Sequence, residues 1–144
     1  MIAQPNKSTL RILIVDDTSQ VRQDLRTVLP MMETEAGVHL EVIGEAADGQ
    51  EAVRQAAALN PDVVLMDLAM PVMNGFAATL EIKARNPHTR VVILTVYNDV
   101  ESREKAVLAG ADDFVEKGVS LERIIKAVAP SPINGGRTTF NCGH

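Results

Sequence analysis

The sequence predicts one α/β domain, in which a parallel sheet of five strands is flanked by five helices. Three short runs, at residues 12–15, 63–66 and 91–94, are apolar at every position and rich in β-branched side chains. Such runs are typical of strands that are buried on both faces. Stretches with helical periodicity lie between them, and strands that alternate with helices build a parallel sheet through right-handed crossovers.

The elements alternate regularly along the chain. After the first strand, apolar residues with helical spacing predict a helix that ends near Pro30; they are Val21, Leu25, Val28, Leu29 and Met32. Residues 40–43 alternate only partly and residues 114–116 are short and half polar, so we expect two edge strands there. Further helices are expected at 50–59, 76–85, 100–109 and 121–128, each followed within two residues by a proline or glycine.

The burial of the strands decides their order in the sheet. With the three fully apolar strands in the centre and the two partly polar strands at the edges, the order is 2-1-3-4-5, which is the flavodoxin-like, doubly wound arrangement. Ligands bind such sheets beyond the carboxyl ends of the strands, where the order reverses. We expect an N-terminal extension at 1–9, the domain at 10–130, and a flexible tail or linker at 131–144, where turn-forming and polar residues prevail.

Composition narrows the class of protein. The chain has 144 residues, of which 46% are hydrophobic, enough for a stable core without disulfides or structural metal. The single cysteine fits a reducing compartment, and neither a membrane span nor a secretory signal is evident, so we expect a cytoplasmic protein without a membrane partner. The net charge of -5 and the 3% aromatic content argue against direct nucleic-acid binding by this chain.

Polar residues follow the strands at the edge where ligands are expected. Asp16 and Asp17 follow the first strand, Asp67 follows the third, and Thr95 and Lys117 end the fourth and fifth. Each alone would be an ordinary turn or surface residue, but the predicted topology brings all five together. Like charges about 4 Å apart repel by on the order of 4 kcal/mol at an effective dielectric constant near 20. The carboxylates therefore need a cation, and oxygen ligands without histidine or cysteine favour Mg²⁺.

A carboxylate in such a place can also act as a nucleophile and form an aspartyl phosphate. Phosphoryl transfer needs in-line positioning and neutralisation of the phosphoryl oxygens. Mg²⁺, the Lys117 ammonium and the Thr95 hydroxyl would supply both. The pattern therefore predicts that Asp67 accepts a phosphoryl group.

These residues resemble the receiver domain of bacterial two-component response regulators. The resemblance runs from about residue 10 to residue 129 and rests on Asp16-Asp17, Asp67-Leu68-Ala69-Met70-Pro71-Val72-Met73-Asn74-Gly75, Leu94-Thr95 and Gly110-Ala111-Asp112-Asp113-Phe114-Val115-Glu116-Lys117. It implies that Asp67 accepts phosphate from a phosphohistidine of a sensor histidine kinase. It also implies that Asp17, Asp67 and the backbone carbonyl of Ala69 bind Mg²⁺, with Asp16 assisting through water, and that Lys117 pairs with the phosphoryl oxygens.

The resemblance further implies a two-state switch, in which Thr95 moves toward the phosphoryl group and Phe114 rotates inward. Some residues depart from the commonest family pattern. Phe114 stands where many members have tyrosine, and Val96 is bulkier than the residue often found there. Ala69 has no side chain to orient a hydrolytic water, and Tyr97 could shield the phosphoryl group. Our hypothesis is a long-lived aspartyl phosphate with slow autodephosphorylation.

The sequence thus predicts a phosphorylation-controlled signalling switch rather than a turnover enzyme. Its expected partners are a sensor histidine kinase and either a second copy of the chain, in a phosphorylation-dependent homodimer, or a downstream effector protein. One alternative is the receiver portion of a larger DNA-binding transcriptional regulator, since about 15 residues after Pro130 are too few for an effector domain. A second is a haloacid-dehalogenase-like phosphatase, which needs an aspartate two residues after the nucleophile, where this chain has Ala69.

Overall fold

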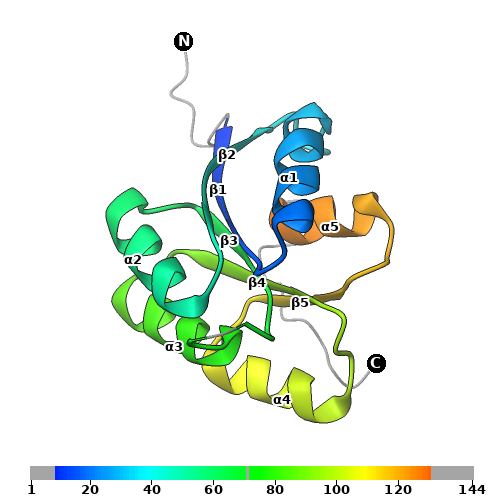
Figure 1. The fold of residues 1–144 in the computed structure, drawn as a ribbon. Coiled ribbons are helices and arrows are strands. Elements are labelled where there is room, and N and C mark those ends of the chain that lie inside the picture. Colours follow the sequence, from blue (N-terminus) through cyan, green and yellow to red (C-terminus); the bar gives the residue numbers. More distant parts are fainter. Residues whose placement is uncertain (1–8, 71, 131–144) are drawn as a thin grey trace.

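A computed structural model describes residues 9–70 and 72–130, and these residues form a five-stranded parallel sheet in the order β2-β1-β3-β4-β5 (Figure 1). The predicted fold class and strand order are confirmed. The strands are β1 (Thr9–Val15), β2 (His39–Ala46), β3 (Val63–Met66), β4 (Arg90–Thr95) and β5 (Asp113–Glu116). The helices are α1 (Ser19–Val28), a 3-10 turn η1 (Leu29–Met31), α2 (Gly49–Leu59), α3 (Gly75–Arg85), α4 (Val100–Ala109) and α5 (Leu121–Val128).

Helices cover both faces of the sheet: α2, α3 and α4 lie on one side, and α1 and α5 on the other (Figure 1). The alternating side chains of β1 show how this layering divides the core. Leu13 and Val15 pack in a cluster that includes residues of α2, α3 and α4, whereas Ile12 and Ile14 pack in a cluster that includes residues of α5. Because every second residue points to the same face, a strand that is apolar at each position feeds both clusters.

Side chains at the helix starts explain where four of the helices begin. Asp48, Asn74, Asp99 and Ser120 each accept a hydrogen bond from the backbone N–H three residues later, and this satisfies a donor that the helix itself leaves open. Gly110 ends α4 with a φ of 96°, a conformation that glycine adopts without steric cost.

The first helix ends near Pro30, as predicted, whereas the second strand is longer than predicted. The apolar stripe continues to Met32, but α1 ends at Val28 and the chain continues as η1, which contains Pro30. Proline cannot donate a hydrogen bond to the preceding turn, so a tighter turn replaces the helix. The edge strand β2 spans His39–Ala46 rather than residues 40–43 alone, because its neighbour β1 pairs with it from His39 to Ala46, with one register shift between Val42 and Gly44.

The predicted flanking segments lie largely outside the described residues. Thr9 already belongs to β1, since it pairs with His39, and nothing further is described before it or after Pro130. Within 9–70 and 72–130, each helix is too short or too polar to span a bilayer.

Candidate functional site

Three carboxylates meet at the carboxyl edge of the sheet, where the strand order reverses between β1 and β3. Asp16 and Asp17 follow β1, and Asp67 follows β3. One carboxylate oxygen from each lies within 4.8 Å of the other two. Asp16 and Asp67 are buried, at 3% and 6% exposure, while Asp17 is exposed. The group therefore has a buried floor and one side open to solvent.

Asp16 is held by three different parts of the chain. Its backbone N–H donates to the carbonyl of Ala46 in β2 at 3.0 Å. Its Oδ1 accepts from the Thr18 N–H at 2.9 Å, and its Oδ2 accepts from the Lys117 ammonium at 2.7 Å. A side chain restrained at both carboxylate oxygens keeps little rotamer freedom, so Asp16 is preorganised.

Lys117 brings a positive charge from the end of β5 into the acidic group. Its Nζ lies 2.7 Å from Asp16 Oδ2 and 3.8 Å from Asp67 Oδ1. Its backbone N–H donates to the carbonyl of Thr95 at 2.6 Å. One ammonium thus faces two of the three carboxylates, which leaves the group with a net negative charge.

Electrostatics make the ionised form of Asp67 costly. Burial, and secondly the neighbouring Asp16, raise the pKa of the Asp67 carboxyl from 3.8 to about 6, although Lys117 and the Leu68 N–H oppose the shift. A bound cation would relieve this cost. The donor set of carboxylate oxygens suits a hard cation such as Mg²⁺, so the residues present fit the metal that the sequence predicts.

The loop after Asp67 depends on a glycine. The N–H of Gly75 donates to the carbonyl of Leu68 at 2.9 Å, and a Cβ on Gly75 would lie 2.1 Å from the carbonyl oxygen of Asp67. No side chain fits in that space, so α3 can begin against the loop after Asp67 only at a glycine. Ala69 lies in the same loop and is exposed.

The two residues expected to form the switch lie on neighbouring strands, β4 and β5. Thr95 is fully buried, and its hydroxyl oxygen accepts a hydrogen bond from the Tyr97 N–H at 3.2 Å. Phe114 is already buried in this structure, and the Arg103 guanidinium of α4 lies 4.7 Å from the centre of its ring. Because phenylalanine has no hydroxyl to keep in contact with water, its burial leaves no polar group unsatisfied.

Arg22, which contacts Asp16, and Glu45, which contacts Arg22, are outside the predicted set of site residues. Arg22 of α1 donates from Nη1 to the backbone carbonyl of Asp16 at 2.7 Å, and from Nε to Glu45 of β2 at 2.9 Å. No sequence signal marks these residues, because the contact depends on how far β2 extends and on its register with β1.

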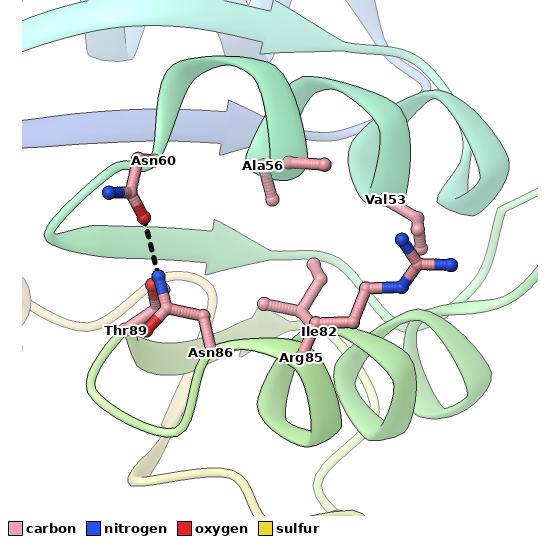
Figure 2. A pocket seen from close by; sticks show the side chains of 8 residues that line it. Val53, Ala56, Asn60, Ile82, Arg85, Asn86 and Thr89 are labelled. Carbon is pink, nitrogen blue, oxygen red and sulfur yellow. Dashed lines mark hydrogen bonds between the residues drawn. The ribbon is translucent and has the colours of Figure 1, made fainter.

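A groove of about 380 Å³ lies between α2 and α3 (Figure 2). Apolar side chains such as Val53 and Ile82 line it, and a hydrogen bond between the Asn86 and Asn60 side chains joins the two helix ends. Asn60 and Thr89 precede the amino ends of β3 and β4. The groove shares none of its lining residues with the acidic edge, so it is separate from the carboxylate site.

The five-stranded parallel fold and the carboxylate group at the carboxyl edge of its sheet together define a receiver-type signalling domain. The family model described as the response regulator receiver domain matches residues 12–129, and the chain belongs to this family. The predicted family resemblance is confirmed. Receiver domains bind Mg²⁺ at an acidic cluster and partner with histidine kinases, and the group Asp16, Asp17 and Asp67 is compatible with Mg²⁺ binding.

The relatives include both short and long proteins. The chain is 37% identical over 118 residues to the chemotaxis protein CheY of Thermotoga maritima, covering 82% of this chain and 93% of that protein. It is 39% identical over 119 residues to the transcriptional regulatory protein LnrK of Bacillus subtilis, covering 83% of this chain and 52% of that protein. A LuxR-family two-component response regulator from Aurantimonas superposes with a TM-score of 0.77 at 32% identity, covering 92% of this chain and 89% of that one.

The chain spans about half the length of several curated relatives that it matches, with 52% for the transcriptional regulatory protein LnrK and 55% for the response regulator protein VraR of Staphylococcus aureus. The described residues form the receiver domain and no more. Neither alternative, the larger DNA-binding regulator or the haloacid-dehalogenase-like phosphatase, is favoured over the receiver domain.

Proposed function

We propose that Asp67 accepts a phosphoryl group from the phosphohistidine of a sensor histidine kinase, and that this modification switches the domain between two states. The observation that carries the proposal is the position of Asp67. It is buried where the strand order reverses, with Asp16 and Asp17 within 4.8 Å and the Lys117 ammonium 3.8 Å away. A nucleophile, a cation-binding group and a fixed positive charge therefore meet at one point.

Phosphoryl transfer to Asp67 needs only side chains at the carboxyl edge of the sheet and the metal ion that they would bind. A carboxylate oxygen of Asp67 forms a bond to phosphorus while the phosphorus–nitrogen bond of the donor breaks, and the electron pair of that bond returns to the imidazole. Lys117 already faces the carboxylate and is placed to pair with the phosphoryl oxygens. Charge spread over those oxygens is what such a site must stabilise.

Asp17, Asp67 and the backbone carbonyl of Ala69 would hold Mg²⁺, with Asp16 assisting through water. When bound, the ion neutralises charge on the phosphoryl oxygens and on the three carboxylates. The chain's own residues set the geometry: Asp16 is restrained at both of its carboxylate oxygens, and Asp67 is restrained by the hydrogen bond from the Leu68 N–H to its Oδ1 at 2.9 Å.

The switch would act through Thr95 and Phe114. The Thr95 oxygen accepts from the Tyr97 N–H, so its own hydrogen can be donated to a phosphoryl oxygen. Movement of Thr95 toward that group would favour the buried position of Phe114 that the structure shows, since a ligand stabilises the state it contacts best. We propose that the readout is a homodimer or a downstream effector protein, that the domain is a switch rather than a turnover enzyme, and that it works in the cytoplasm.

Phosphorylation with acetyl phosphate and Mg²⁺, followed by intact-mass spectrometry, tests this proposal. We expect the wild-type chain to gain the mass of one phosphoryl group, and Asp67→Asn to gain none. Asp24→Asn, which removes an exposed carboxylate of α1, is the matched control and should be modified like the wild type. Equal modification of Asp67→Asn, or full modification in the presence of EDTA, would contradict the assignment.

A further inference from the structure

A side chain from α1 reaches back to the peptide group that joins two of the three carboxylate residues. Arg22 Nη1 donates to the carbonyl oxygen of Asp16 at 2.7 Å. This carbonyl belongs to the peptide bond between Asp16 and Asp17, and the orientation of that peptide plane sets the directions of both side chains. Arg22 itself is largely buried, with 18% of its side chain exposed.

The other contacts of residues 16–18 leave the Asp16 carbonyl oxygen to Arg22. The N–H of Asp16 is held by Ala46 of β2, and its carboxylate by Thr18 and Lys117. The Thr18 contact closes a turn around the Asp16–Asp17 peptide, but none of these contacts reaches the Asp16 carbonyl oxygen. The Arg22 side chain donates a hydrogen bond to the Asp16 carbonyl oxygen, and this bond links the Asp16–Asp17 peptide to α1.

Glu45 of β2 orients Arg22 and offsets part of its charge. The Arg22 Nε donates to Glu45 Oε1 at 2.9 Å, and Arg26 pairs with the other carboxylate oxygen at 2.6 Å. An uncompensated guanidinium beside a cation-binding group would repel a divalent ion. With Glu45 as its partner, Arg22 can hold the peptide without adding a full positive charge beside the site.

We propose that Arg22, oriented by Glu45, is a positioning residue that fixes the Asp16–Asp17 peptide and thereby sets the affinity of the acidic cluster for Mg²⁺. This inference rests on the proposed function, because it takes Mg²⁺ as the ligand of Asp16, Asp17 and Asp67. It adds a determinant of affinity that lies outside the set of metal-binding and phosphoryl-binding residues.

Isothermal titration of the full chain with MgCl₂ tests the inference, with Arg26→Gln as the matched control. Arg26 pairs with the same glutamate but is half exposed, and no hydrogen bond from it to Asp16 is described. We expect Arg22→Gln to weaken Mg²⁺ binding about tenfold or more, as is typical when a residue that orients metal ligands is lost. Arg26→Gln should change the affinity by less than about twofold, as expected for a solvent-exposed ion pair.

A local signal separates positioning from general loss of stability. The carbonyl ¹³C resonance of Asp16 should shift in Arg22→Gln and stay near its wild-type position in Arg26→Gln, with both variants measured in EDTA. Arg22→Lys keeps one donor and should recover part of the Mg²⁺ affinity. If Arg22→Gln fails to fold, Arg22→Lys provides the same comparison, since it weakens the contact with the Asp16 carbonyl and keeps the positive charge beside Glu45.

The outcomes distinguish this inference from the proposal on which it rests. Wild-type affinity in Arg22→Gln, or equal weakening in Arg22→Gln and Arg26→Gln, would overturn the positioning role while leaving Mg²⁺ binding intact. A wild-type chain that does not bind Mg²⁺ would overturn the proposed function, and the inference with it.

Discussion

Replacing Asp67 by asparagine should stabilise the metal-free protein at neutral pH. In the wild type, the folded chain must keep a buried carboxylate ionised beside Asp16, and this raises the pKa of Asp67 to about 6. Asparagine has nearly the same shape and no charge, so it removes the cost while filling the same space. Lys117 keeps its 2.7 Å contact with Asp16, so the substitution does not leave the ammonium without a partner.

The size of the effect follows from the pKa. A change from 3.8 to about 6 corresponds to about 3 kcal/mol of free energy, and screening at the open side of the site reduces this, so we expect about 1 to 3 kcal/mol. Because the pKa is higher in the folded state, the folded chain binds this proton more tightly. The wild type therefore gains stability from Asp67 as the pH falls through 6 toward 4, and loses it as the pH rises.

The assay compares urea unfolding of wild type and Asp67→Asn in EDTA, from pH 4 to pH 8. The difference in unfolding free energy should be largest above pH 6 and should shrink toward pH 4, where the Asp67 carboxyl is protonated in the folded state and about half protonated in the unfolded state, whose pKa is 3.8. Glu81→Gln, on the exposed surface of α3, is the control for loss of one negative charge. A variant equal to or less stable than the wild type at pH 7.5 would refute the electrostatic reasoning.

Three further predictions concern the loop after Asp67, the core and the lifetime of the phosphoryl group. Gly75→Ala should destabilise the fold by about 2 kcal/mol or more in urea unfolding, because the new Cβ would lie 2.1 Å from the Asp67 carbonyl oxygen; an unchanged unfolding curve would show that the loop yields. Thr79→Val should raise the unfolding free energy by about 1 kcal/mol, since the Thr79 hydroxyl is buried and makes no hydrogen bond within the described residues; destabilisation would point to a partner for that hydroxyl. Ala69→Asn and Tyr97→Ala should each shorten the lifetime of the phosphorylated chain, followed by mass spectrometry, and unchanged lifetimes would remove the idea that these residues slow hydrolysis.

The strand order and the acidic edge were predictable because both depend on local pattern. Residues 63–66 are apolar throughout, and only a strand covered on both faces tolerates this. Once the central strands are known, the carboxyl ends follow from chain direction. Asp16 and Asp67 therefore fall at one edge whatever the details of packing, and the structure places their carboxylates within 4.8 Å of each other and of Asp17.

The buried position of Phe114 was not predictable from the short, half-polar segment in which it occurs. It depends on α4, which covers this side of β5 and brings the Arg103 guanidinium over the ring. The full length of β2 was also not predictable from the sequence. Residues 44–46 belong to the strand because they pair with β1, and their own sequence has no apolar pattern that indicates a strand.

By itself, the sequence determined the fold class, the strand order and the set of residues that end the central strands, because period and burial pattern are properties of short segments. Only the tertiary structure decided that Arg22 contacts the Asp16 carbonyl and that Glu45 stands beside it. That contact joins α1 to a strand 23 residues further along the chain. It exists because the register of β2 on β1 places Glu45 opposite Ile14, close to the turn that carries the carboxylates.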